Sequence, residues 1–203
     1  KLLLKLFLFG VLSTGVALFL EIYAEKIFPF SLQSNIIGIL FRSFIIISFC
    51  EELVKWLFTY VICWKDKNFN YVYDAIVYCV FISLGFASIE NLIAILSNSG
   101  GFTLALQRGL ITVPAHAFFG IISGYYLGIA KKYEARRWNK RKRKYIILSL
   151  LIPIIVHGMF DSLLFLSSTA SLLFATALIV YLYLSSALKV VKTSSEAKKI
   201  TRR

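Results

Sequence analysis

Six long apolar stretches dominate this chain. They run approximately over 2–23, 35–64, 73–97, 108–130, 145–166 and 168–188. Each is long enough to supply the roughly 20 residues with which an α-helix crosses a bilayer. The composition agrees, because 59% of the residues are hydrophobic and only 16% are charged, whereas soluble domains are about a quarter charged. The sequence therefore predicts an all-α, polytopic helical membrane bundle of about six transmembrane helices.

Two of these stretches are not expected to be single straight helices. The stretch 35–64 is long for one span, so we expect an interfacial piece over 33–43, which carries Arg42, before the span itself. The stretch 108–130 contains Pro114. Because an internal proline removes a helix hydrogen bond, we expect a kink there or a short separate helix before it.

The positive charges gather on one side of the predicted membrane. Of the 23 Lys and Arg residues, 19 lie near the N terminus, just after the second stretch, in 131–144 and in 189–203. An even number of predicted crossings separates these sites, and short loops rich in Lys and Arg stay in the cytoplasm. Both termini are therefore predicted to be cytoplasmic, and the loops near 24–34 and 97–102 to face outside.

The net charge of +13 does not indicate nucleic acid as a partner. The basic run RRWNKRKRK, within 131–144, follows an apolar stretch, where such charge sets topology and rests on anionic headgroups. We therefore expect membrane lipids as partners and no nucleic acid. Residues 1–188 are predicted to form one domain, followed by 189–203 as a basic cytoplasmic tail.

Seven ionisable side chains lie inside the apolar stretches. The run SFCEELVKWLF, residues 48–58, alone contains three of them. Each such group costs about 2.5–3.5 kcal/mol at the centre of a membrane helix. The topology places all seven at a similar depth, in the outer half of the bilayer, so we expect one shared functional site. The seven residues are Glu51, Glu52, Lys55, Glu90, His116, His157 and Asp161.

The spacing of these residues places several of them on shared helix faces. Glu51 and Lys55 are four residues apart, so the ammonium can offset a carboxylate, whereas Glu52 points elsewhere and could reach another neighbour. His157 and Asp161 are also four apart, the geometry in which a carboxylate orients an imidazole and holds its tautomer. The sequence thus predicts two charged pairs on two different helices.

Small and polar neighbours accompany these groups. In HAFFGIISGYYLG, His116 is followed at steps of four by Gly120, Gly124 and Gly128. This ridge predicts close packing of a neighbouring helix. Asn91, which follows a buried glutamate, is expected to act as a polar strut or as a hydrogen-bond donor to a substrate.

Four short motifs, in order along the chain, carry a resemblance to a known family. EELVK matches EExxK, FASIEN matches FxxxEN, HAFFG matches HxxxG and HGMFD matches HxxxD. Together they resemble the PrsW family of bacterial membrane proteases, which is related to the type II CAAX prenyl-protease superfamily. The resemblance covers about residues 45–165, the predicted motif-bearing core, and implies a multi-pass protein of the bacterial plasma membrane.

The resemblance implies a glutamic-type intramembrane protease that needs no cofactor. Its expected substrate is a single-pass membrane protein, an anti-sigma factor by analogy, cut near the extracytoplasmic side. Hydrolysis by water needs a base, a stabilised oxyanion and a proton for the leaving amine. We expect Glu51 to act as the base, with Glu52 sharing or supporting that role, and His116 and His157 to polarise the carbonyl or protonate the leaving nitrogen. The expected supporting residues are Lys55, Glu90, Asn91 and Asp161.

Two other interpretations remain open at this point. The two histidines and several carboxylates could ligate zinc in a metal-dependent membrane protease, although an HExxH motif is absent. Buried acids and histidines also form proton relays in ion-coupled transporters. Against a transporter stand the lack of an obvious inverted repeat and the clustering of the groups in one leaflet.

Overall fold

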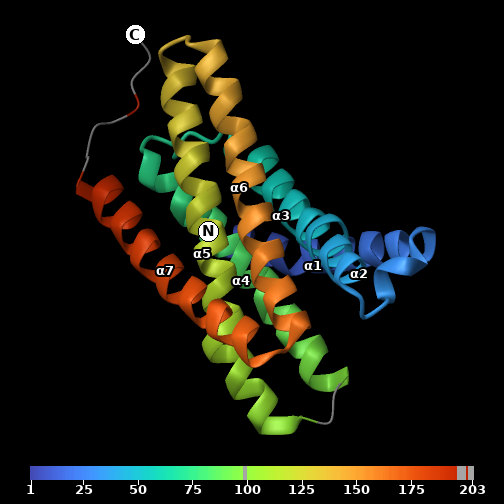
Figure 1. The fold of residues 1–203 in the computed structure, drawn as a ribbon. Coiled ribbons are helices and arrows are strands. Elements are labelled where there is room, and N and C mark those ends of the chain that lie inside the picture. The colour runs from blue at the N-terminus through green and yellow to red at the C-terminus, as the bar shows by residue number, and fades with distance from the viewer. Residues whose placement is uncertain (98–99, 196–199, 201–203) are drawn as a thin grey trace.

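The computed structural model describes residues 1–97, 100–195 and 200, which form a bundle of helices (Figure 1). The described residues contain no strand, so the predicted all-α fold is confirmed. The elements, in chain order, are α1 (Leu2–Ile27), the 3₁₀-helix η1 (Pro29–Leu32), α2 (Ile36–Phe41), the π-helix η2 (Arg42–Ser48), α3 (Phe49–Cys63), α4 (Val72–Ser97), α5 (Gly101–Ala135), α6 (Asn139–Leu166) and α7 (Thr169–Ser195).

Five of these helices, namely α1, α4, α5, α6 and α7, are long and apolar enough to cross a membrane. Many of their outward side chains are large and apolar, such as Leu96 and Leu188, which are 77% and 71% exposed. Such surfaces are stable against lipid rather than water. The chain is thus a multi-pass helical membrane protein, as predicted.

The second predicted stretch is a single helical path with an irregular centre. The expected interfacial piece, 33–43, is not separated from the span that follows, because η2 joins α2 to α3 and the junction residues Phe41 and Phe49 keep helical dihedrals. A π-turn bonds each residue to the fifth one along, which shifts the register of the helix that follows. The Phe44 side chain of this turn packs closely against α6 because Gly158, which it contacts, has no side chain. The turn therefore sets the rotation with which α3 enters the bundle.

Helices α5 and α6 are longer than predicted. Helix α5 begins at Gly101 rather than near 108 and continues through Pro114 without a separate N-terminal helix. Most of 131–144, expected to be a loop, is helical, and only 136–138 connect α5 to α6. Lys and Arg are good helix formers, so charge density alone does not end a helix. The basic segment therefore extends both helices beyond their apolar parts.

Helix α4 packs closely between α1 and α5. A Cβ atom added at Gly10 of α1 would lie 2.1 Å from the Ile82 carbonyl oxygen of α4. On the other side, a Cβ atom at Gly124 of α5 would lie 2.5 Å from the Ala75 carbonyl oxygen, and Gly120 also faces α4. The predicted glycine ridge is thus the contact between α5 and α4. This contact holds His116, one turn before Gly120, beside α4.

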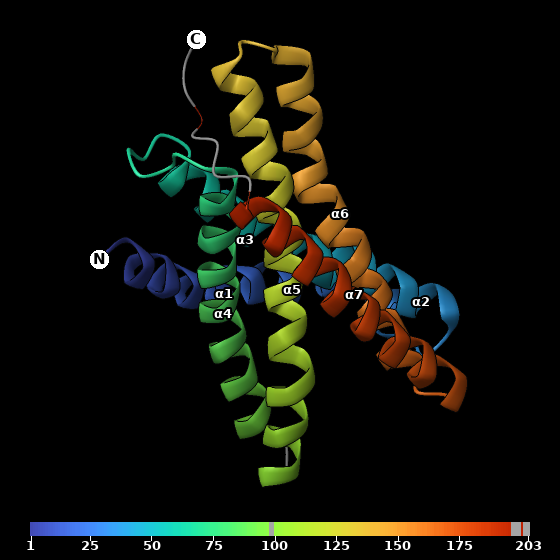
Figure 2. The ribbon, with the colours of Figure 1, turned by 90° about the vertical axis from the view of Figure 1, so that its left-hand side faces the viewer.

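The connections alternate between two ends of the bundle. In Figure 2, the N terminus and the α5–α6 connection lie to the left and top, whereas α2 and the α6–α7 connection lie to the right. Part of the predicted outer turn, 98–99, and seven residues of the predicted tail, 196–199 and 201–203, lie outside the described residues. Lys189–Ser195 of that tail continue helix α7.

Candidate active site

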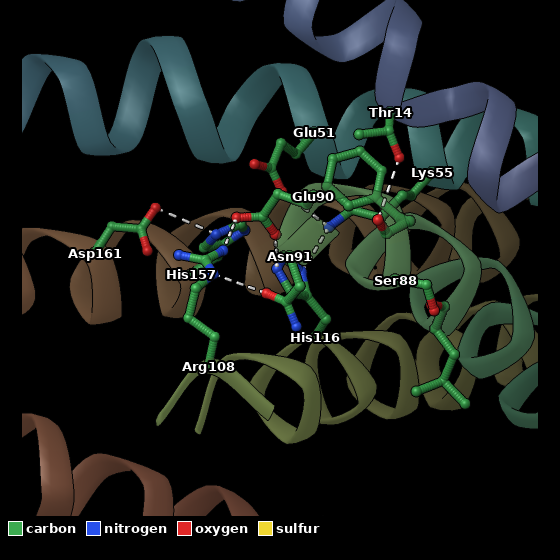
Figure 3. Close-up of polar contacts among 12 residues, drawn as sticks. Thr14, Glu51, Lys55, Ser88, Glu90, Asn91, Arg108, His116, His157 and Asp161 are labelled. Carbon is green, nitrogen blue, oxygen red and sulfur yellow. Dashed lines mark hydrogen bonds and ion pairs between the residues drawn. The ribbon is translucent and has the colours of Figure 1, made fainter. Parts of the chain in front are cut away.

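The ionisable groups that the sequence places inside the membrane meet in one cluster (Figure 3). Four helices contribute to it. Its five most buried residues are each 5% exposed or less, namely Glu51, Glu52, Lys55, His116 and His157. Helix α3 supplies Glu51, Glu52 and Lys55, α4 supplies Glu90 and Asn91, α5 supplies His116, and α6 supplies His157 and Asp161. The structure therefore brings together all eight predicted catalytic and supporting residues.

The Lys55 ammonium lies at the centre of the cluster. Its Nζ is 2.6 Å from Glu52 Oε1 and 3.3 Å from Glu51 Oε2. The same nitrogen is 3.2 Å from His116 Nδ1 and lies over the Phe86 ring, 4.3 Å from its centroid. The lysine was expected to pair with Glu51, but its shorter contact is to Glu52. One cation thus joins both carboxylates of α3 to the histidine of α5.

Both histidines turn Nδ1 toward the centre and Nε2 toward an outer carboxylate. His116 Nε2 is 2.7 Å from Glu90 Oε2, and His157 Nε2 is 3.2 Å from Asp161 Oδ2. An ammonium can only donate, so Lys55 requires an unprotonated Nδ1 on His116, and Nε2–H then donates to the glutamate. His157 Nδ1 lies 3.0 Å from Glu52 Oε1, so this ring faces a carboxylate on each side.

Aromatic rings enclose the two imidazoles. The His116 and His157 rings meet edge to face with centroids 5.3 Å apart. Phe119 stacks on His157 at 4.6 Å, and Phe86 lies 5.6 Å from His116. These apolar walls restrict the rings and exclude water from their faces. The electrostatic interactions inside the cluster are correspondingly strong.

Arg108, which the sequence analysis did not single out, completes the network. Its Nη2 is 2.5 Å from Glu90 Oε1, and its Nε donates to Asn91 Oδ1 at 2.9 Å. The side chains of Arg108 and Glu90 are 23% and 25% exposed, so the cluster is open at this end. The available signal was an arginine at the first residue of the predicted stretch 108–130, because a charged side chain there needs a partner if it lies within the bilayer.

Glu21 of α1 is a second residue that sequence reasoning missed. Its Oε1 is buried and has no hydrogen-bond partner among the described residues. The carboxylate lies within electrostatic range of Lys55, Glu90 and His157. Helix α1 therefore contributes an acidic side chain to the surroundings of the cluster.

Four of the central residues could also hold a metal ion. Glu51, Glu52, His116 and His157 each offer one ligand atom, and these atoms lie within 4.8 Å of one another. Carboxylates and imidazoles are common zinc ligands. Both histidines carry a carboxylate on their outer nitrogen, the arrangement that orients metal-binding imidazoles. The donor set therefore fits a divalent cation, although the Lys55 ammonium contacts the same groups.

Comparison with known proteins shows the family to which this chain belongs. The model of the family described as PrsW family intramembrane metalloprotease matches residues 1–188. A Protease PrsW from Halalkalibacterium halodurans is 42% identical over 129 residues, which cover 64% of this chain and 57% of that protein. No solved structure matches the chain.

Two further relatives are covered more fully. The Protease PrsW of Clostridioides difficile is 32% identical over 200 residues, covering 98% of this chain and 82% of that protein. The Bacillus subtilis protein of the same name is 34% identical over 161 residues, covering 79% and 68%. The family match extends well beyond the four motifs. This chain therefore belongs to the PrsW family of intramembrane metalloproteases.

Proposed function

We propose that this protein is an endopeptidase that hydrolyses a peptide bond of a membrane-anchored protein. The observation that carries the proposal is the convergence of carboxylates and imidazoles from four helices at one buried point. Peptide hydrolysis requires a base for water, a donor to the oxyanion and a proton for the leaving nitrogen. Each of these chemical groups is present within the cluster.

Glu51 is the proposed base. Glu52 is held by Lys55 at 2.6 Å and by His157 at 3.0 Å. Glu51 has, among the described residues, only the longer contact of 3.3 Å to Lys55. Its carboxylate therefore keeps acceptor capacity for a water molecule, while Glu52 fixes the lysine and the histidine. This division of roles makes Glu51 the more reactive of the two.

The histidines complete the proposed reaction. Water attacks the carbonyl carbon as Glu51 takes its proton, and the carbon–nitrogen bond then breaks. The proton passes to the leaving nitrogen, so one water is consumed and a carboxylate and an amine are released. His157, which faces Glu52 and Asp161, is the proposed donor to the oxygen or nitrogen that develops charge. His116, oriented by Glu90, supports the same face.

A second candidate is the metal-dependent form of this hydrolysis. It is favoured by the inward Nδ1 atoms of both histidines and by the description of the family. Glu51, Glu52, His116 and His157 would hold the ion. The chemistry that zinc supplies when bound is Lewis acidity toward water and a carbonyl oxygen. In this form, Glu90 and Asp161 orient the two imidazoles through their outer nitrogens.

The proposed substrate is a single-pass protein of the bacterial plasma membrane, specifically an anti-sigma factor. Support comes from the motif resemblance and from the predicted depth of the cluster, which favours cleavage near the extracytoplasmic side. The exposed end of the cluster, at Arg108 and Glu90, lies in the parts of α4 and α5 nearest the predicted outer turn.

Co-expression with candidate single-pass anti-sigma factors tests this proposal. The wild type and the matched control Glu25→Gln, which changes a glutamate outside the cluster, should release a shortened substrate fragment. Glu51→Gln should release none while it accumulates in the membrane to the same level. Release of the fragment by Glu51→Gln would refute the assignment of the base.

Chelator treatment and metal analysis of the purified protein separate the two mechanisms. Hydrolysis by carboxylate alone predicts activity that strong chelators leave unchanged. Stoichiometric zinc that is lost together with activity, and restored by added zinc, would establish the metal-dependent form.

A further inference from the structure

A small pocket lies at the opposite end of the bundle from the exposed end of the cluster, where α5, α6 and α7 approach the start of α4. Its volume is about 230 Å³. Three cations, Lys132, Arg136 and Lys192, line it together with three tyrosines, Tyr125, Tyr133 and Tyr145. No part of the proposed hydrolysis uses these residues.

The positive charge of this pocket has no carboxylate partner among the described residues. The described residues that line the pocket include no Asp or Glu. Within the described part of the chain, the side chains of Lys132 and Lys192 form no ion pair or hydrogen bond, and Arg136 only faces the Trp138 ring at 5.9 Å. The nearby Glu134 is already engaged by Lys131 at 2.9 Å. Three cations so close together favour an anionic ligand.

The tyrosines give the pocket a second kind of recognition group. Tyr133 and Tyr145 stack with centroids 5.3 Å apart, which joins the end of α5 to the start of α6. Among the described residues, the hydroxyls of Tyr125, Tyr133 and Tyr145 make no hydrogen bond. They are therefore free to donate to a ligand oxygen. Amphipathic rings of this kind are enriched at the membrane–water interface.

We propose that this pocket binds the phosphate of an anionic phospholipid. The pocket lies where three candidate spans change from apolar to basic, which is the depth of the headgroups. Its apolar side, formed by Val72 and Ile129, suits the glycerol and upper acyl chain. Basic pockets between spanning helices on the cytoplasmic side are suited to anionic headgroups. The bound lipid would tie α7 to α4, α5 and α6.

Native mass spectrometry of the full chain in neutral detergent, titrated with phosphatidylglycerol or phosphatidylcholine, tests this proposal. The wild type should bind phosphatidylglycerol about tenfold more tightly than phosphatidylcholine. A pocket triple variant, Lys132→Gln with Arg136→Gln and Lys192→Gln, should lose this preference. The matched control removes the same charge outside the pocket lining, with Lys140→Gln, Arg143→Gln and Lys144→Gln, and should keep it.

Other outcomes would overturn the proposal. Equal weakening in both triple variants would show a general attraction to the basic surface, and no weakening in either would exclude the pocket. Displacement of phosphatidylglycerol by low millimolar inorganic phosphate would assign the pocket to a soluble anion. If the pocket triple variant does not fold, Lys192→Gln alone and the Tyr133→Phe, Tyr145→Phe pair should each weaken phosphatidylglycerol binding severalfold.

Discussion

The buried cluster and the basic end of the bundle differ in whether their charged side chains have partners of opposite charge. In the cluster, charges pair both within and between helices: Lys55 lies 2.6 Å from Glu52 of the same helix, and Arg108 of α5 lies 2.5 Å from Glu90 of α4. At the basic end, Lys132 and Lys192 have no carboxylate partner among the described residues. A charge inside a bilayer must find a partner within the protein, whereas a charge at the interface meets water and headgroups. Substitutions in the cluster should therefore have large, coupled effects, and those at the basic end small ones.

The sharpest contrast comes from the same substitution in both regions. Lys55→Met leaves two buried carboxylates without their cation and should destabilise the fold by about 3–5 kcal/mol. Lys132→Met should change stability by less than about 0.5 kcal/mol. Unfolding by a denaturing detergent measures both. A similar loss of stability in the two variants would show that the two regions do not differ in their dependence on charge pairing.

Replacing a histidine of the cluster should mainly affect the reaction. His157→Ala and His116→Ala should each lower kcat/KM about a hundredfold or more, the usual scale for one acid–base or oxyanion group. Rates on a purified single-pass substrate would measure this. Activity within a few-fold of the wild type in either variant would remove that histidine from the mechanism.

Along α5, packing should be sensitive where the helix contacts α4. A Cβ atom at Gly120 would lie 2.8 Å from Ser83 Oγ, whereas one at Gly109 of the same helix would meet nothing within 4 Å. Gly120→Leu should therefore cost about 1–3 kcal/mol through overpacking and lower the folded yield, while Gly109→Leu should not. Equal yields of monodisperse protein from the two variants would contradict the close helix contact.

The smallest effect is expected at the rim of the cluster. Arg108→Gln removes the contacts that hold Glu90 and Asn91, and should lower kcat/KM about three- to tenfold because Glu90 still contacts His116. Arg136→Gln, the same change at the basic end, should leave the rate unaltered. The ¹⁵N chemical shifts of the His116 imidazole should change in Arg108→Gln but not in Arg136→Gln. An unchanged spectrum in Arg108→Gln would show that Arg108 does not position His116 through Glu90.

Helix faces were predictable from the sequence, whereas contacts between helices were only partly so. The four-residue step from His157 to Asp161 predicted their contact, and the glycine ridge predicted the close packing of α5. The periodicity of a sequence indicates which residues of one helix share a face. The pair His157 and Asp161 lies on one helix, and the glycine ridge lies on another. The contacts of Lys55 with His116 and of Arg108 with Glu90 depend on how separate helices are placed, which no local pattern encodes.

Irregular backbone and the ends of helices were harder to predict from the sequence than helix faces. The π-helical turn at Arg42–Ser48 begins and ends with helical dihedrals, and its sequence RSFIIIS contains no glycine or proline that would mark it off from an ordinary helix. The long ends of α5 and α6 were missed because a basic run is both a topology signal and a good helix former. As a result, the predicted loop over 131–144 was wrong, although its charge pattern was informative.

The rate of cleavage by Glu51→Gln tests the central claim most directly. The variant keeps the shape of the side chain but cannot take a proton, so single-turnover cleavage in detergent should fall at least a hundredfold. Wild-type folding should be retained, and Glu25→Gln should cleave at the wild-type rate. Cleavage near the wild-type rate by well-folded Glu51→Gln and Glu52→Gln would contradict the account, since neither carboxylate would then activate water.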